Sequence, residues 1–352
     1  MRTDLLIIGR DALTERSFDF KRFFMLLSDK GYDIENIYSA DDEAEISGTI
    51  KRISSSSVIV IGDTDKIFSA VSNIDADEEN PQYFKSGDNT YILLPEYDEQ
   101  YIKDILIPVL NSKSKTFFNT VIFKVFGKTE YEIKELLKDQ IHNRNKITFN
   151  FYPSILECGV HVRYSSYTSS AVINEIVGAV GELLRPYSYA YSDVSLEEQT
   201  VKQLIASNKR ISIVETFTKG GLTKELSKSR EIDALMLESI IVGSEKGIRS
   251  RLGVDKKTIA DYGAVSDEAA YVITGNMFAN PDCDIALTVL GDISSVPADG
   301  GDCVFYIAIG DRNAIHVFAQ HYFGSRTEIA QAGVKHAVCT LYKFLVEEKN
   351  TK

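Results

Sequence analysis

The sequence predicts an α/β protein with three domains. Short apolar runs that end at glycine alternate with segments of helical apolar spacing, both at the start of the chain and after residue 193. The stretch between these two regions reads instead as a compact α+β unit. A chain of 352 residues is also long enough for two or three domains that each bury a core of their own.

The first domain, placed at residues 1–112, is predicted to be a parallel sheet with crossover helices. Strands that alternate with helices along the chain imply parallel pairing. An acidic and polar stretch at residues 75–88 predicts a surface loop. The expected strands are residues 4–8, 32–38, 58–61 and 91–94, and the expected helices are residues 18–30 and 43–53.

The middle domain, placed at residues 116–192, is predicted to combine four strands with two helices. The expected strands are residues 117–126, 147–152, 157–164 and 187–191, and the expected helices are residues 130–141 and 169–184. Alternating tyrosines on the last of these strands could stack bases, but without flanking basic residues a packing or dimer face is the favoured interpretation.

The third domain, placed at residues 195–350, alternates strands and helices again. Ser195 and Ser266 each precede a segment of helical spacing and are expected N-caps. The expected strands are residues 211–214, 240–242, 284–290, 304–309 and 315–320, and the expected helices are residues 196–206, 220–226, 267–277 and 328–345.

The amino-acid composition limits the classes of molecule that are expected as binding partners. The formal net charge is −12, from 39 Lys+Arg and 51 Asp+Glu, and no basic block is present, so neither nucleic acid nor an anionic membrane is an expected partner. No apolar run reaches the roughly 18 residues that a membrane span needs. The four cysteines lie far apart and indicate neither a zinc site nor a disulfide framework. We expect a cytoplasmic protein whose amino terminus is a first strand and not a signal peptide.

The turn at residues 215–221 (ETFTKGG) is the strongest candidate for a ligand site. It lies between a predicted strand and a predicted helix, where the amides at the helix start point outward and could bind an anion or stabilise an oxyanion. The alternative is a glycine-relieved turn in which Thr216 or Thr218 caps the helix.

A second strand end carries two carboxylates. Asp63 and Asp65 follow the strand at residues 58–61 and could hold a divalent cation near a phosphate. Capping of the next helix explains the same residues, and this interpretation is favoured because no glycine-rich phosphate loop is present. Histidine ligation is not expected, since His316 and His321 should face opposite sides of their strand.

Several segments together resemble the CinA family of competence/damage-inducible proteins. Residues 252–254 (LGV) and 263–268 (GAVSDE) are similar to the family's "LGV … GAVSEE" stretch, and residues 215–221 are similar to its "ESCTGG" turn. Residues 91–95 (YILLP) and 126–130 (FGKTE) resemble the family's "ILLPG" and "FGIxExE" segments. The strand at 284–290, the turn at 297–301 and the helix start at 326–328 follow in the same order, so the resemblance covers nearly the whole chain.

The resemblance implies a function for each domain. The first domain would resemble molybdopterin-biosynthesis proteins, with metal-dependent ADP-ribose pyrophosphatase activity and a divalent metal near Asp63 and Asp65. The middle domain would be KH-like. The third would resemble a nicotinamide-mononucleotide amidohydrolase, and the protein would form a homodimer. No cofactor other than the divalent metal is implied.

The resemblance also assigns roles to residues of the third domain. The nucleophilic serine of the family aligns with Thr216. Either Lys246, after a two-residue gap, or Lys219, at a position where the family has glycine, can stand for its base lysine. Helix-start amides at Gly220 would hold the oxyanion and Arg326 the phosphate. The remaining substrate-binding positions implied are Glu215, Thr218, Lys219 and Gly291.

The sequence departs from the family pattern at both sites. Without a gap, the family's tyrosine, lysine and threonine align with Gly243, Ile248 and Leu290, and the diphosphate loop of the first domain shrinks to residues 62–65. Three hypotheses follow. They are an amidohydrolase that uses Thr216, a nucleotide-binding protein without catalysis, and a scaffolding paralogue that binds no nucleotide.

Overall fold

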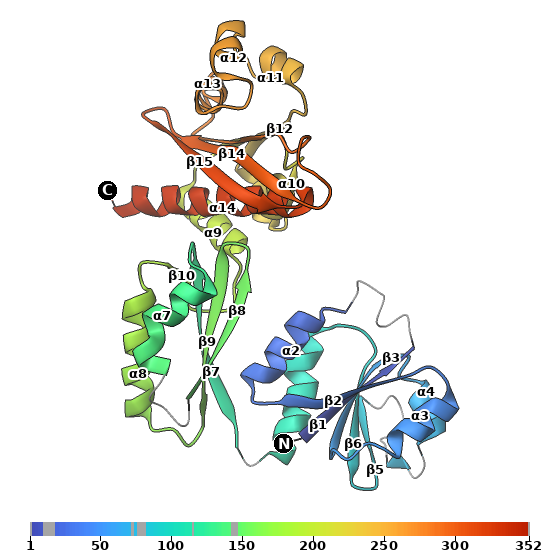
Figure 1. The fold of residues 1–352 in the computed structure, drawn as a ribbon. Coiled ribbons are helices and arrows are strands. Elements are labelled where there is room, and N and C mark those ends of the chain that lie inside the picture. Colours follow the sequence, from blue (N-terminus) through green and yellow to red (C-terminus); the bar gives the residue numbers. More distant parts are fainter. Residues whose placement is uncertain are drawn as a thin grey trace. The chain divides into compact units, whose positions relative to one another are not determined.

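The computed structural model describes residues 2–9, 18–71, 74–75, 82–114, 116–141 and 147–350. The described residues form a mixed α/β structure with three β-sheets, one in each of the three predicted regions (Figure 1). By contacts the chain divides into two compact units, one of residues 1–121, 139–150 and 161–179, and one of residues 122–138, 151–160 and 180–352. Since these contact units cut through the middle sheet, the predicted bounds of the three domains stay predictions.

The first sheet has the strand order β2-β1-β3-β6-β5-β4. The pairs β2–β1, β1–β3 and β3–β6 are parallel, as the alternation of strands and helices predicted. The last two strands are antiparallel additions in a stretch that was predicted to be a loop. The bounds are β1 (Arg2–Ile8), β2 (Asp33–Ala40), β3 (Ser57–Gly62), β4 (Ile74–Asp75), β5 (Tyr83–Ser86) and β6 (Asn89–Leu94).

Successive residues of the central strands bury on opposite faces of this sheet. Leu5 and Ile59 pack with α2 and the segment around α6, whereas Leu6 and Val60 pack with α3 and α4. The segment from α5 to α6 was not predicted as helical. The bounds are α2 (Phe20–Asp29), α3 (Glu43–Ile50), α4 (Lys66–Ala70), α5 (Glu99–Tyr101), the π-helix η1 (Ile102–Leu106) and α6 (Ile107–Lys113).

The middle sheet has the order β10-β7-β9-β8. All of its strands and both helices lie where the sequence predicted them. Tyr189 is buried and its hydroxyl donates to Glu157 at 2.7 Å, which is the packing role favoured for it. The bounds are β7 (Phe118–Phe126), β8 (Ile147–Ser154), β9 (Glu157–Ser165), β10 (Ser188–Ala190), α7 (Glu130–Ile141) and α8 (Ser170–Leu184).

The third sheet has the order β12-β11-β13-β14-β15 and carries the predicted turn. The pairs β12–β11 and β11–β13 are parallel, and the last two pairs are antiparallel. The sheet places the ends of β11 and β13 side by side, because Glu215 pairs with Val289. The bounds are β11 (Ile211–Glu215), β12 (Met236–Ile241), β13 (Ile285–Gly291), β14 (Gly301–Gly310) and β15 (Ile315–Gly324).

Helices cover both faces of this third sheet. Helices α9, α10 and α14 pack in one apolar cluster with β11, β13 and β14, and α11, α12 and α13 pack on the other face. Ser195 and Ser266 accept hydrogen bonds from the amides of Glu198 and Ala269, which confirms both predicted N-caps. The bounds are α9 (Leu196–Ser207), α10 (Gly221–Leu226), the 3₁₀ helix η2 (Arg230–Ala234), α11 (Glu245–Arg251), α12 (Lys256–Tyr262), α13 (Asp267–Met277) and α14 (Arg326–Asn350).

None of the described helices combines the length and apolar composition that crossing a bilayer requires. All four cysteines lie in described segments, where each is buried and unpaired.

Candidate functional site

The turn between β11 and α10 is shaped by two residues in left-handed backbone conformations. Lys219 has a φ of +52° and Gly220 a φ of +87°. A Cβ on Gly220 would lie 2.9 Å from the side chain of Ile241, so glycine is required there for both conformation and space. The chain can therefore reverse tightly and start α10 directly after the buried strand.

The carboxylate of Glu215 fills the start of α10. One of its oxygens accepts from the Thr218 hydroxyl at 2.7 Å and from the Leu222 amide at 3.0 Å. The other oxygen accepts from the amide and the hydroxyl of Thr223, at 2.9 and 2.7 Å. Glu215 is fully buried, and these four bonds satisfy both of its oxygens. Two helix-start donors, the amides of Leu222 and Thr223, are thus already bound to this carboxylate.

The hydroxyl of Thr216 ties the end of β11 to the end of β13. Its oxygen accepts from the amide of Gly291 at 2.9 Å. The same oxygen lies 2.9 Å from the carbonyl oxygen of Gly291 and 3.2 Å from that of Val289, so its single proton goes to one of these acceptors. Thr216 is only 6% exposed.

Gly291 leaves space for the aromatic residue beside Thr216. A Cβ at Gly291 would lie 2.7 Å from the ring of Phe217 and 2.8 Å from Phe305. The two rings pack with their centroids 5.1 Å apart. At the end of β13, Gly291 therefore leaves room for the two packed rings and also hydrogen-bonds the hydroxyl of Thr216.

A cavity of about 590 Å³ opens beside the turn. Thr218 and Gly221 line it from the turn, Lys224 and Lys228 from α10 and its end, and Gln331 from α14. Lys228 is paired with Glu225. Lys224, in contrast, is exposed and forms no ion pair with any residue that the structure describes. Among the residues that the structure describes, the cavity thus offers one ammonium group without a carboxylate partner.

Lys335 also lines this cavity, but its charge is already balanced. Its Nζ lies 2.6 Å from the Glu157 carboxylate and also pairs with Glu197. Burial lowers the pKa of Lys335, but the two carboxylates together raise it above its ordinary value. This triad joins α14 to α9 and to the start of β9.

The remaining predicted residues of the third domain lie apart from the cavity. The guanidinium of Arg326 donates to the carbonyls of Val296 at 2.8 Å and Ser294 at 2.9 Å, which fixes the loop before β14. Lys246 is exposed in the first turn of α11. Neither Lys246 nor Thr216 is among the residues that line the cavity. The predicted residues that the fold gathers at the turn are Glu215, Thr216, Thr218, Lys219, Gly220 and Gly291.

Comparison with known proteins identifies the third domain. The model of the CinA C-terminal domain family matches residues 193–345. Residues 193–345 belong to the CinA C-terminal domain family. It is 29% identical over 213 residues to a competence-damage inducible protein of Alkaliphilus metalliredigens, covering 59% of this chain and 52% of that protein. A relative from Caldicellulosiruptor saccharolyticus is 25% identical over 260 residues, covering 72% of this chain and 63% of that protein.

The chain spans between about half and two thirds of the length of these curated relatives. Among solved structures it is similar to a CinA superfamily protein of Klebsiella pneumoniae, with 21% identity and a TM-score of 0.39, over 44% of this chain and 99% of that chain.

The carboxylates predicted to bind metal in the first domain lie at its surface. Asp63 is exposed and its carboxylate pairs with Lys66 at 3.0 Å, while Asp65 precedes α4 without forming a side-chain cap. Across the described segments, no group of three or more His, Cys, Asp or Glu side chains could hold a metal ion. Two carboxylates hold a divalent cation only together with further ligands such as phosphate oxygens or waters.

Sequence reasoning missed the two lysines that matter most for the charge of the cavity. Lys224 comes three residues after Gly221, so helical spacing places it on the same side of α10, and this signal was available. The role of Lys335 depends on Glu157 and Glu197, which are far away in the sequence, and only the folded chain brings them together.

Proposed function

We propose that this protein binds a pyridine mononucleotide of the nicotinamide mononucleotide class in the cavity beside residues 215–221, without hydrolysing it. The family resemblance supplies the class of ligand, and the cavity supports binding. A volume of about 590 Å³ lies within the roughly 300–1,000 Å³ common for small-molecule sites. Lys224 would contact the phosphate, because it is the ammonium group of this cavity without a carboxylate partner among the described residues.

We propose that hydrolysis does not occur because the hydroxyl of Thr216 is already hydrogen-bonded. A nucleophile needs a base to take its proton and a free approach to the carbonyl carbon. The Thr216 oxygen is buried and bonded to the backbone of Gly291, and Lys246 is exposed on another helix. The amides of Leu222 and Thr223, which could stabilise an oxyanion, already donate to Glu215.

The first domain supports no proposal of pyrophosphatase chemistry. That reaction would depend on a metal, and the described residues contain no group of three or more His, Cys, Asp or Glu that could hold one. The homodimer implied by the resemblance is proposed for the whole protein, and light scattering after gel filtration would test it.

Two measurements on the same purified protein test the proposal. Nicotinamide mononucleotide should raise the melting temperature, since a ligand that binds only the folded state at about 100 times its Kd adds about 2.7 kcal/mol of stability. Mass spectrometry of the same mixture should show no nicotinic acid mononucleotide. The variant Lys224→Met should lose most of the thermal shift, whereas Lys202→Met, on the exposed surface of α9, should keep it.

The other two hypotheses give different results. Product that forms with the native protein and disappears in Thr216→Ala would establish an amidohydrolase. Neither product nor a thermal shift at millimolar nucleotide would leave a scaffolding paralogue. Either result would overturn the proposal.

A further inference from the structure

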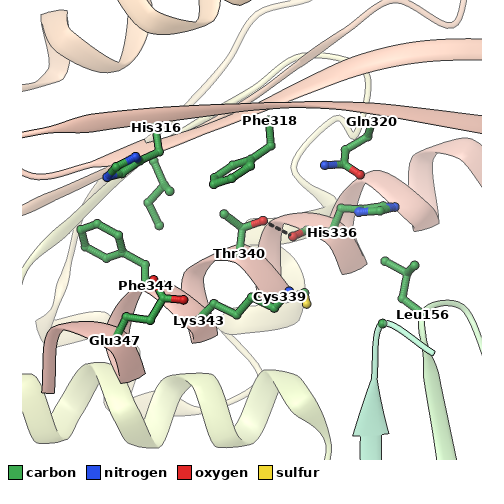
Figure 2. A pocket seen from close by; sticks show the side chains of 12 residues that line it. Leu156, His316, Phe318, Gln320, His336, Cys339, Thr340, Lys343, Phe344 and Glu347 are labelled. Carbon is green, nitrogen blue, oxygen red and sulfur yellow. Dashed lines mark hydrogen bonds between the residues drawn. The ribbon is translucent and has the colours of Figure 1, made fainter. Parts of the chain in front are cut away.

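A second cavity, of about 730 Å³, lies between β15 and the carboxyl-terminal half of α14. Figure 2 shows the side chains of His316, Phe318 and Gln320 directed from the strand toward those of α14. The α14 residues that line the cavity are His336, Cys339, Thr340, Lys343, Phe344 and Glu347. None of the lining residues belongs to the cavity beside the turn, so the two cavities are separate.

Ordinary periodicity explains why these side chains converge. On β15, residues 316, 318 and 320 alternate with residues that face the other side of the sheet. On α14, residues three, four and seven positions apart share one stripe of the helix. One end of the cavity is closed by Gly127 and Leu156, whose backbones are joined by a hydrogen bond of 2.8 Å from amide to carbonyl.

Apolar side chains form part of the cavity wall. Phe318 on the strand and Phe344 on the helix provide two aromatic faces, with Ile309 and Leu156 beside them. Cys339 is buried, and burial raises the pKa of its thiol to about 11. The thiol is therefore neutral at pH 7 and acts here as a small apolar group. A planar aromatic ring fits such walls well.

Among the residues that line this cavity, Lys343 carries a positive charge. The Lys343 ammonium lies 5.1 Å from the centroid of the Phe126 ring and forms no ion pair with another residue of the described segments. Glu347, one turn further along α14, is exposed and has an interaction of its own. The Thr340 hydroxyl donates to the His336 carbonyl, so it offers a ligand only an acceptor. Gln320 and the imidazoles of His316 and His336 add further polar groups.

We propose that this cavity binds a small aromatic carboxylate, with its ring against Phe318 and Phe344 and its carboxylate at Lys343. Lys343 is the one Lys or Arg side chain in the lining and Glu347 the one carboxylate, and a single ammonium matches a monoanion. A diphosphate or a dinucleotide would bring more negative charge than one cation can balance. The amide of Gln320 can add a hydrogen bond to the carboxylate or to a ring substituent.

Isothermal titration with 2-naphthoate tests this proposal, with 2-naphthylmethanol as a neutral ligand of similar shape. The native protein should bind naphthoate saturably with a Kd of at most about 1 mM, and the alcohol at least about tenfold more weakly. Lys343→Met keeps the apolar stem of the side chain and removes its charge, and should weaken naphthoate binding about tenfold or more.

Lys224→Met is the matched control, because it removes the unpaired ammonium of the other cavity. It should leave naphthoate affinity unchanged, and circular dichroism should show that both variants are folded. Four results would each overturn the proposal: no saturable binding by the native protein, equal binding of acid and alcohol, unchanged affinity in Lys343→Met, or a loss of affinity in Lys224→Met.

Discussion

Replacing Glu215 by glutamine should destabilise the third domain strongly, although the two side chains have nearly the same shape. Each carboxylate oxygen accepts one backbone amide and one hydroxyl, at 2.7 to 3.0 Å. The NH₂ group of glutamine can donate to a threonine hydroxyl, but it cannot accept from a backbone amide. One of the amides of Leu222 and Thr223 would therefore lose its acceptor beside the fully buried side chain of residue 215.

The expected cost follows from these bonds. A buried amide without an acceptor costs about 1–3 kcal/mol, and hydrogen bonds to a charged group are worth roughly 1 kcal/mol more than neutral ones. Together these effects predict a loss of about 3 kcal/mol in Glu215→Gln. For a folding unit of about 150–250 residues, that loss lowers the melting temperature by roughly 6–12 °C.

Calorimetry and hydrogen exchange together measure this effect. Because a chain with several domains need not unfold in one step, the exchange of the Leu222 and Thr223 amides localises the loss to α10. Glu198→Gln is the control, since Glu198 is exposed on α9 and its 2.7 Å pair with Lys202 should be worth less than about 1 kcal/mol. If the two variants lost the same stability and the α10 amides exchanged as in the native protein, the assignment of Glu215 as the structural anion of the turn would be refuted.

Three further predictions concern packing and charge. Gly291→Ala should cost about 2 kcal/mol in thermal unfolding because its methyl would meet Phe217, while Gly243→Ala, which meets no atom within 4 Å, should be close to neutral. Lys335→Met should cost about 3 kcal/mol because it leaves the carboxylates of Glu157 and Glu197 buried without their cation. A smaller loss of stability in Lys335→Met than in Lys202→Met would contradict this account. Burial, helped by the Lys343 charge, lowers the pKa of His336 to about 4. Since the unfolded chain binds this proton near pH 6.5, the free energy of unfolding should fall as the pH drops from about 6.5 to 4. This fall should be smaller in His336→Gln. An NMR titration that shows the imidazole titrating near pH 6.5 would contradict the prediction.

Local sequence determined the elements whose signals lie within a few residues. Ser266 precedes α13, and its hydroxyl accepts from the amide three residues later, so the cap could be predicted from neighbouring positions alone. The same holds for the glycines that start α10, and for the parallel order implied by alternating strands and helices. Order and spacing of short motifs also carried the family resemblance, which the match of the CinA C-terminal domain to residues 193–345 bears out.

The tertiary structure decided what the predicted site residues do. The hydroxyl of Thr216 is bonded to Gly291, which lies 75 positions away, so no local pattern could show that it is engaged. Likewise Lys335 meets Glu157 across 178 positions, whereas Lys224 has no such partner among the described residues. Hydrogen bonds and ion pairs depend on distances of about 3 Å between atoms. Sequence spacing sets such distances only within a turn or a helix, and across a sheet the packing of whole elements sets them.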